Sequence, residues 1–256
     1  MSVSRANFLK SLGKSVTGLA LGTGVATAAQ ALAGKFGPIR EAESTSPPVE
    51  KAVPFHTSGP GEGNRIALTF DDGPTPGVTE IVLEELGKRK LHTTFFMVGQ
   101  RVLEAPELAR RVATEGHEIG NHTFNHLKLT TLSDQRVDEE LQQLQETLGE
   151  TVGFRPVWLR PPYGALRKNQ AGIAERNNLG VVLWNIDAHD WSQPGVDAIV
   201  ETVLTGAAAG SIVLCHDLHR QTAESLPQIL DGLQERGFNF VTVSRLLGSV
   251  EREQRA

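Results

Sequence analysis

Residues 65–248 alternate between two patterns of hydrophobic and polar positions. One pattern consists of short runs rich in β-branched and aromatic residues, which are typical of buried strands. The other consists of longer segments whose apolar residues recur every three to four positions, as on one face of an amphipathic helix. Because the two patterns take turns along the chain, they predict a parallel sheet with crossover helices. The predicted strands are RIALTF (65–70), TTFFMVG (93–99), HEIGN (117–121), VWLRPP (157–162), VVLWNID (181–187), SIVLCHD (211–217) and NFVTVS (239–244).

The predicted helices include TEIVLEELGKRK (79–90), PELARRVATEG (106–116), DQRVDEELQQLQETLGE (134–150) and SLPQILDGLQERG (225–237). Seven strand-and-helix units over this region average about 26 residues each, whereas an eight-fold barrel typically needs about 250 residues. We therefore expect an α/β fold with a small, distorted (β/α)7-type barrel, and an open doubly wound sheet is the alternative. In both architectures functional residues gather at the carboxyl ends of the strands.

The composition fits one ordinary domain with additional sequence at its ends, in a chain of 256 residues. The formal net charge is -5, and the basic residues form no run that would bind a phosphate backbone. Nucleic acid is therefore not an expected partner. The single cysteine, Cys215, lies in an apolar run and excludes an intrachain disulfide. We expect the protein to be a monomer.

The two ends of the chain differ from residues 65–248. Residues 1–33 have a basic head without acidic residues, a middle rich in glycine and alanine, and the small residues ALA at 31–33, which is the order of an export signal. The stretch SRANFLK resembles a twin-arginine export motif in which Ala6 replaces the second arginine. Residues 34–64 are predicted to be a disordered linker, and residues 249–256 a tail. We expect export to the periplasm, the cell wall or the outside, without a membrane span in the mature chain.

Carboxylates and imidazoles stand together at the ends of two predicted strands. RIALTF is followed by Asp71, Asp72 and a chain-breaking Gly-Pro pair. Adjacent strand residues point to opposite faces, so the two carboxylates can share a site only where the strand breaks. His122 and His126 in GNHTFNH are four positions apart, a spacing that can bring both imidazoles to one face of a helix or together across a turn. Together with Asp72 they would form a three-ligand catalytic metal site, and the alternative is a set of ordinary loop residues without a metal.

A third strand end offers groups that would support a reaction at such a metal. Asp71, next to a metal ligand, is a candidate general base. Arg160 in LRPPYG could pair with Asp71 and keep it ionised. The backbone N–H of Tyr163, in the same loop, could stabilise a developing oxyanion.

The last two strand ends offer a proton donor. His216, near the end of SIVLCHD, could protonate a departing amine if a carboxylate keeps its imidazole charged. Asp190 or Asp187, both in NIDAHDW, could be that carboxylate. Trp191 follows directly and is a candidate pocket wall, with core packing as the alternative.

Five motifs occur in the order TFDDGP, HTFNH, RPPYG, DAHDW and LCH, and with them the chain resembles the polysaccharide deacetylase family, also called carbohydrate esterase family 4 or the NodB-homology domain. The resemblance covers residues 65–248 and implies the distorted β/α barrel of that family. Motif by motif, it implies that Asp71 is the base, that Asp72, His122 and His126 bind the metal, that Arg160 pairs with Asp71, that Tyr163 offers its backbone N–H, that Asp190 tunes the acid His216, and that Trp191 and Leu214 border the pocket for the acetyl methyl group.

The function that the resemblance implies is metal-dependent removal of N-acetyl groups from a polysaccharide containing N-acetylglucosamine, with release of acetate. The expected metal is Zn²⁺, and a carboxylate with two imidazoles also accepts Co²⁺ or Ni²⁺. Peptidoglycan, chitin-like oligomers and exopolysaccharides all carry the same acetamide, so the polymer stays open. An esterase for O-acetylated polysaccharides would use the same metal and base. A glycan-binding module without activity would usually lack a metal ligand or the base, and none of these residues is missing here.

Overall fold

The computed structural model describes residues 53–248. The predicted export signal (1–33), most of the predicted linker (34–64) and the predicted tail (249–256) lie outside the described residues and stay predictions. Within residues 53–248, none of the helices combines the length and the apolar character that crossing a membrane requires.

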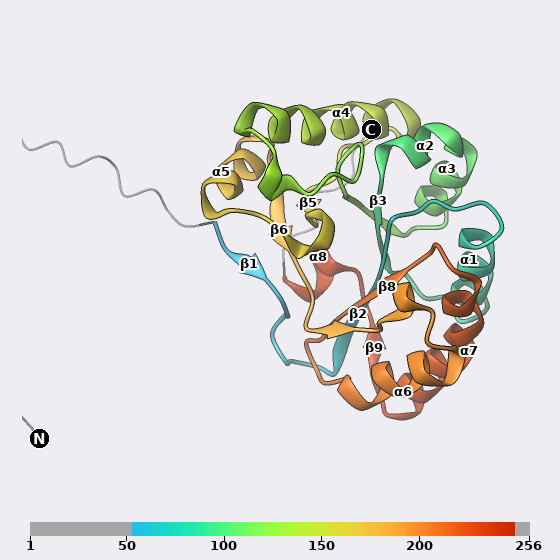
Figure 1. The fold of residues 1–256 in the computed structure, drawn as a ribbon. Coiled ribbons are helices and arrows are strands. Elements are labelled where there is room, and N and C mark those ends of the chain that lie inside the picture. Colours follow the sequence, from blue (N-terminus) through green and yellow to red (C-terminus); the bar gives the residue numbers. More distant parts are fainter. Residues whose placement is uncertain (1–52, 249–256) are drawn as a thin grey trace, which may run out of the picture. The chain divides into compact units, whose positions relative to one another are not determined.

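The strands form a nine-stranded sheet in the order β1-β6-β5-β4-β3-β2-β8-β7, with β9 paired to β2 (Figure 1). All pairs of these strands are parallel. The strands are β1 (Phe55–His56), β2 (Arg65–Asp71), β3 (Thr94–Met97), β4 (Glu118–Asn121), β5 (Trp158–Leu159), β6 (Gly180–Val182), β7 (Ile186–Asp187), β8 (Ile212–His216) and β9 (Asn239–Phe240).

Except for α8, which follows the last strand, the helices lie between strands in sequence and pack in two groups. In one group α7 contacts α1 and α6, and in the other α4 contacts α2, α3 and α5 (Figure 1). The helices are α1 (Thr79–Lys88), α2 (Gly99–Glu104), α3 (Pro106–Thr114), α4 (Asp134–Val152), α5 (Lys168–Arg176), α6 (Val196–Gly206), α7 (Arg220–Glu235) and α8 (Val243–Leu246), with short 3₁₀ turns η1 (Leu129–Thr131), η2 (Pro162–Gly164) and η3 (Asp190–Ser192).

The connection between β6 and β7 explains why the sheet curls. The two strands are separated by residues 183–185 alone, yet β6 pairs with β1 and β5 while β7 pairs with β8 at the end of the sheet order. A flat sheet could not bring these positions together over three residues, since an extended chain spans at most about 3.6 Å per residue. The prediction of a distorted, incomplete α/β barrel is confirmed.

Strand β2 shows how the sequence places functional groups inside the curl. Ile66, Leu68 and Phe70 belong to the large hydrophobic cluster that also contains residues of the covering helices. Ala67 belongs to a separate cluster with residues of other strands. Because strand side chains alternate, Thr69 and Asp71 lie on the same face as Ala67. Both faces are buried, which is why RIALTF has an almost continuous apolar pattern.

Three predicted segments differ from the structure. VVLWNID is two strands, because Leu183 N donates to His56 O at 2.7 Å whereas the Asn185 carboxamide accepts from Ile212 N at 2.8 Å, so the run changes partner strand midway. NFVTVS is a strand for two residues only, after which the Thr242 hydroxyl caps α8. Phe55–His56 lie inside the predicted linker but pair with β6, so the ordered domain begins before residue 65.

Candidate active site

The carboxyl end of β2 turns sharply enough to bring two adjacent aspartates to one site. The backbone of Asp72 has a φ of 75°, in the left-handed region that costs an L-residue about 1–2 kcal/mol. At Gly73 a Cβ would lie 2.1 Å from Asp217 Oδ2, so the chain passes too close to that carboxyl for a side chain. As a result His122 Nε2 is 3.7 Å from Asp71 Oδ2 and 3.2 Å from Asp72 Oδ1.

Asp217, which the sequence placed at a strand end without a role, supports this turn. Its Oδ2 accepts a hydrogen bond from Thr79 Oγ1 at 2.5 Å, and Thr79 Oγ1 accepts one from Thr75 N at 2.7 Å. Burial raises the pKa of Asp217 to about 7, although the hydrogen bond from Thr79 opposes that rise. An aspartate directly after the predicted strand-end histidine was the available signal for this residue.

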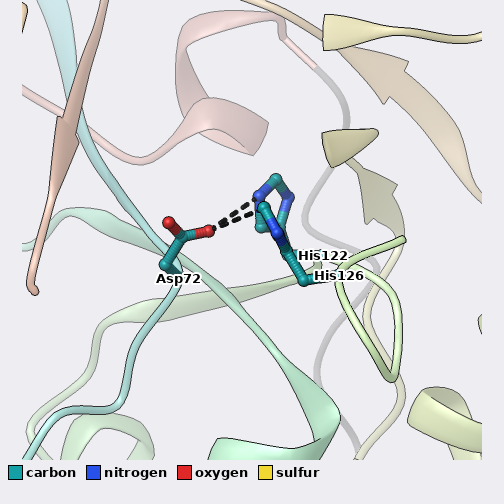
Figure 2. Close-up of side chains that lie close together, drawn as sticks. All are labelled: Asp72, His122 and His126. Carbon is teal, nitrogen blue, oxygen red and sulfur yellow. Dashed lines mark ion pairs between the residues drawn. The ribbon is translucent and has the colours of Figure 1, made fainter. Parts of the chain in front are cut away.

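Asp72, His122 and His126 converge as a three-ligand cluster (Figure 2). Asp72 Oδ1 lies 3.2 Å from His122 Nε2 and 3.0 Å from His126 Nε2. One ligand atom from each residue lies within 4.8 Å of the other two. The histidines come from β4's carboxyl end and the following loop, where His126 has a φ of 55°, so the four-residue spacing is that of a turn. Within residues 53–248 no other set of three His, Cys, Asp or Glu side chains converges in this way.

The hydrogen bonding of the cluster fits a metal ion. His122 Nδ1 lies 2.6 Å from Arg160 O, an acceptor, so Nδ1 carries the proton and Nε2 is left with its lone pair toward the cluster. Asp72 Oδ1 is buried and has no hydrogen-bond donor among the described residues. Burial alone would raise the pKa of Asp72, but the two facing imidazoles, when protonated in the metal-free chain, lower it well below the usual range. A buried, ionised oxygen beside two imidazole nitrogens is a donor set that divalent transition metals bind.

Asp71 and Arg160 form a buried ion pair next to the cluster. Arg160 Nη1 donates to Asp71 Oδ1 at 2.7 Å and to Thr69 Oγ1 at 2.6 Å, and Nη2 donates to Leu183 O at 3.0 Å. The guanidinium lies 4.1 Å from the centre of the Phe96 ring. Burial lowers the pKa of Arg160 and Asp71 opposes that effect, while the guanidinium stays charged at any pH relevant to the protein. A fixed cation therefore lies against one oxygen of the Asp71 carboxylate.

His216 pairs with Asp190, and this settles a choice that the sequence left open. His216 Nδ1 lies 2.8 Å from Asp190 Oδ1, and His216 N donates to Asp190 Oδ2 at 2.7 Å. Thr222 on α7 donates to the same Oδ2 at 2.6 Å. Asp187 instead accepts from His189 N at 2.8 Å. Burial alone would lower the pKa of His216, but its hydrogen bond to Asp190 and the charges of nearby carboxylates raise it to about 9.

The remaining predicted site residues line the surroundings to different degrees. Tyr163 has a φ of 60°, and its exposed ring lies 5.0 Å from that of His126. Trp191 is 54% exposed, so it is a surface side chain rather than a core residue. Leu214 is buried in β8, two residues before His216 and therefore on the same face of the strand. A cavity of about 390 Å³ is lined by Asp72 and His126 together with Gln100, Arg101 and Glu104 of α2.

Comparisons with known proteins identify relatives of this chain. The family model described as polysaccharide deacetylase matches residues 58–182. The chain is 40% identical over 184 residues to the peptidoglycan-N-acetylglucosamine deacetylase PgdA of Listeria monocytogenes, covering 72% of this chain but 39% of that protein, so it spans about two fifths of its length. It is 41% identical over 193 residues to a peptidoglycan-N-acetylglucosamine deacetylase of Bacillus cereus, covering 73% of this chain and 90% of that protein.

A solved structure supports the same relationship. The crystal structure of the Bc1960 peptidoglycan N-acetylglucosamine deacetylase, in complex with 4-naphthalen-1-yl-N-oxidanyl-benzamide, superimposes with a TM-score of 0.75 at 32% identity and covers 77% of this chain and 94% of that one. The ordered motifs, the curled parallel sheet and the match over most of the Bacillus cereus protein lead to one conclusion. The chain belongs to the polysaccharide deacetylase family.

Proposed function

We propose that the protein is a metal-dependent deacetylase that removes N-acetyl groups from a polysaccharide containing N-acetylglucosamine and releases acetate. One observation carries the proposal: two ion pairs of opposite polarity end neighbouring strands beside the three-ligand cluster. Asp71 and His216 are paired positions in the register of β2 and β8. One presents a carboxylate backed by a cation, and the other presents an imidazolium backed by a carboxylate.

Asp72, His122 and His126 are the residues that would hold the metal ion. We propose Zn²⁺, with Co²⁺ or Ni²⁺ as alternatives, because a carboxylate with two imidazoles suits all three. When bound, the ion would supply Lewis acidity toward the acetamide oxygen and the attacking water. Asp71 Oδ2 lies 3.7 Å from His122 Nε2, close enough to take part in this chemistry. The other oxygen of Asp71, Oδ1, accepts a hydrogen bond from Arg160.

The other residues divide the proton transfers. Asp71 is proposed to accept the proton of the attacking water through Oδ2, since Oδ1 is held by Arg160. The backbone N–H of Tyr163 is proposed to donate to the developing oxyanion. His216 then gives its proton to the nitrogen as the carbon–nitrogen bond breaks, so that the amine leaves neutral and acetate remains. Trp191 and Leu214 are proposed to border the acetyl methyl group.

The pairing of His216 with Asp190 favours an amide over an ester as the substrate. An amine is a poor leaving group unless it is protonated, whereas an alkoxide leaves with less help. A buried carboxylate that raises the pKa of His216 to about 9 keeps the acid charged at neutral pH. An O-acetyl esterase would need this less, so the deacetylase is the better supported of the two functions.

The names of the relatives favour peptidoglycan as the polymer. Both curated relatives are peptidoglycan-N-acetylglucosamine deacetylases. We infer that this chain acts on the same polymer as an exported monomer, and that residues 1–33 are its export signal. Chitin-like oligomers and exopolysaccharides are the other substrates to test, because they carry the same acetamide.

Acetate release from purified glycans tests the proposal. The chain, loaded with Zn²⁺, is expected to release acetate from peptidoglycan or N-acetylglucosamine oligomers and little from O-acetylated xylan. Asp71→Asn is expected to keep the metal and to lose activity by about 10²–10⁴-fold, the usual contribution of a general base. Asp231→Asn, an exposed aspartate paired with Arg89, is the matched control and should leave the rate unchanged. Wild-type turnover by Asp71→Asn would refute the assigned base.

A further inference from the structure

The loop that carries His126 is held from two sides. Toward α2, Gly99 N and Gln100 N donate to Thr123 O and Phe124 O at 3.1 and 3.0 Å. Phe124 is buried, and a Cβ on Gly99 would lie 2.3 Å from its ring, so the helix and the loop are in close contact. These contacts fix the first half of the loop, which reaches His126 through one hydrogen bond, from His126 N to Thr123 Oγ1 at 3.1 Å.

A buried carboxylate on α4 holds the second half of the loop. Glu140 Oε2 accepts from the backbone N–H of Asn125 at 2.8 Å, and Oε1 accepts from the Asn125 side-chain amide at 2.7 Å. Arg136 Nη2 donates to Oε1 at 2.6 Å. The Glu140 side chain is 0% exposed. The Asn125 carboxamide oxygen in turn accepts from Gln100 Nε2 at 2.7 Å, which links α2 and α4 through this one residue.

The two histidines of the cluster differ in how their rings are fixed. The ring of His122 is held directly by the carbonyl of Arg160. Within residues 53–248 no comparable hydrogen bond fixes the ring of His126, which contacts Asp72 and the ring of Tyr163. The position of His126 therefore follows from its backbone, which has a φ of 55° and directly follows Asn125. A loosened backbone would leave this ring free to sample other positions.

We propose that Glu140 is a positioning residue for the metal. Its hydrogen bonds with Asn125 hold the backbone of His126 in the one conformation that completes the three-ligand cluster. The apparent dissociation constant of a metal rises in proportion as the binding-competent conformation becomes less populated. Supporting residues around metal ligands typically contribute 10–100-fold in affinity. The inference rests on the metal site of the proposed function but not on the reaction or its substrate.

The test compares metal affinity with folding in Glu140→Gln. A glutamine has the same shape but one acceptor oxygen, so its NH₂ group must face a donor of Asn125 or Arg136. We expect the dissociation constant for Zn²⁺, measured by competition with a chromogenic chelator, to rise about 10–100-fold. The visible absorption of the Co²⁺-loaded protein should change as well, because it reports the ligand geometry. Neither readout depends on turnover.

Glu118→Gln is the matched control for loss of stability. Glu118 is also a buried glutamate in a hydrogen-bond network, with Thr94 and Ser244, at the opposite end of β4 from the histidines. It should lower the melting temperature of the metal-free protein without weakening Zn²⁺ binding. A Glu140→Gln protein that is destabilised but binds Zn²⁺ within twofold of wild type would overturn the proposal.

A second variant keeps the test decisive if Glu140→Gln does not fold. Asn125 is half-buried, and Asn125→Ala removes the side-chain amide that donates to Glu140. This variant should also weaken Zn²⁺ binding. Where both single variants fold, the double variant should bind no more weakly than the worse of the two, because they break one contact. Unchanged affinity in Asn125→Ala would refute the proposal. If wild type binds Zn²⁺ but releases no acetate, the proposed function fails while this inference stands.

Discussion

Replacing Asp190 with asparagine should remove the charge that makes His216 an acid. The structure raises the pKa of His216 from 6.5 to about 9, and the difference corresponds to roughly 3 kcal/mol at 1.36 kcal/mol per pKa unit. In Asp190→Asn the side chain keeps its size but loses its charge, so burial is opposed only by the charges of Asp71 and Asp72, and the pKa of His216 falls toward its ordinary value. If the pKa returned fully to 6.5, the protonated fraction at pH 8 would fall from about 90% to about 3%, so about 30-fold is the upper limit of the loss.

The pH dependence of kcat/KM separates this effect from general damage. The alkaline limb of the wild-type profile should move toward acid in Asp190→Asn, by up to about two pH units. A bound divalent cation lowers the pKa of His216 in both proteins, so the displacement between the two profiles is the quantity to compare. The control is Asp187→Asn, because Asp187 lies in the same stretch but accepts from His189 N. Its profile should keep the wild-type limb.

The metal-free chain provides a second readout of the same pair. Because the folded-state pKa of His216 is raised, its contribution to stability is fully present below pH 6.5 and is lost as the pH rises through about 9. The free energy of unfolding in urea should therefore fall by roughly 3 kcal/mol over this range in wild type, and much less in Asp190→Asn. Equal losses in the two proteins, together with coincident alkaline limbs, would refute the role assigned to Asp190.

Two further substitutions test the structure of the site. Gly73→Ala should lower both Zn²⁺ affinity and stability, because its Cβ would lie 2.1 Å from Asp217 Oδ2 and must displace the turn that carries Asp72. Chelator competition measures the affinity and urea unfolding the stability, and wild-type values in both would contradict the reasoning. Arg160→Met should cost about 3–5 kcal/mol of unfolding free energy, since it leaves the 2%-exposed Asp71 without its cation. Urea unfolding at pH 7 measures the cost, and a change below 1 kcal/mol would contradict the reasoning.

The sequence was most informative where a residue's position on a strand fixed its direction. Asp71 directly follows the predicted strand RIALTF, and the register of β2 with β8 places it beside His216. The convergence of Asp72, His122 and His126 was predicted from their types and spacing, and the structure brings them together. Their roles, and the identity of the metal, stay predictions.

Residues in turns were less predictable, because side-chain directions in a turn follow no regular alternation. Asp187 and Asp190 are three positions apart, and His189 between them has a φ of 54°, so residue types and spacing left both carboxylates open and only the family resemblance indicated Asp190. Glu140 is missed for another reason. It lies on α4 among several charged residues, and only the packing of that helix against the histidine loop shows that its carboxylate is fully buried.

Asp71 and His216 stay chemically distinct because each of them has its own buried partner. Asp71 and His216 end adjacent strands in register. Without other partners, an aspartate and a charged histidine at such positions would form a simple ion pair with each other. Each instead has a buried partner of its own: Arg160 holds one oxygen of Asp71, and Asp190 accepts from both the ring and the backbone of His216. The site can therefore present a base and an acid at the same pH, which is what hydrolysis of an amide requires from a single active site.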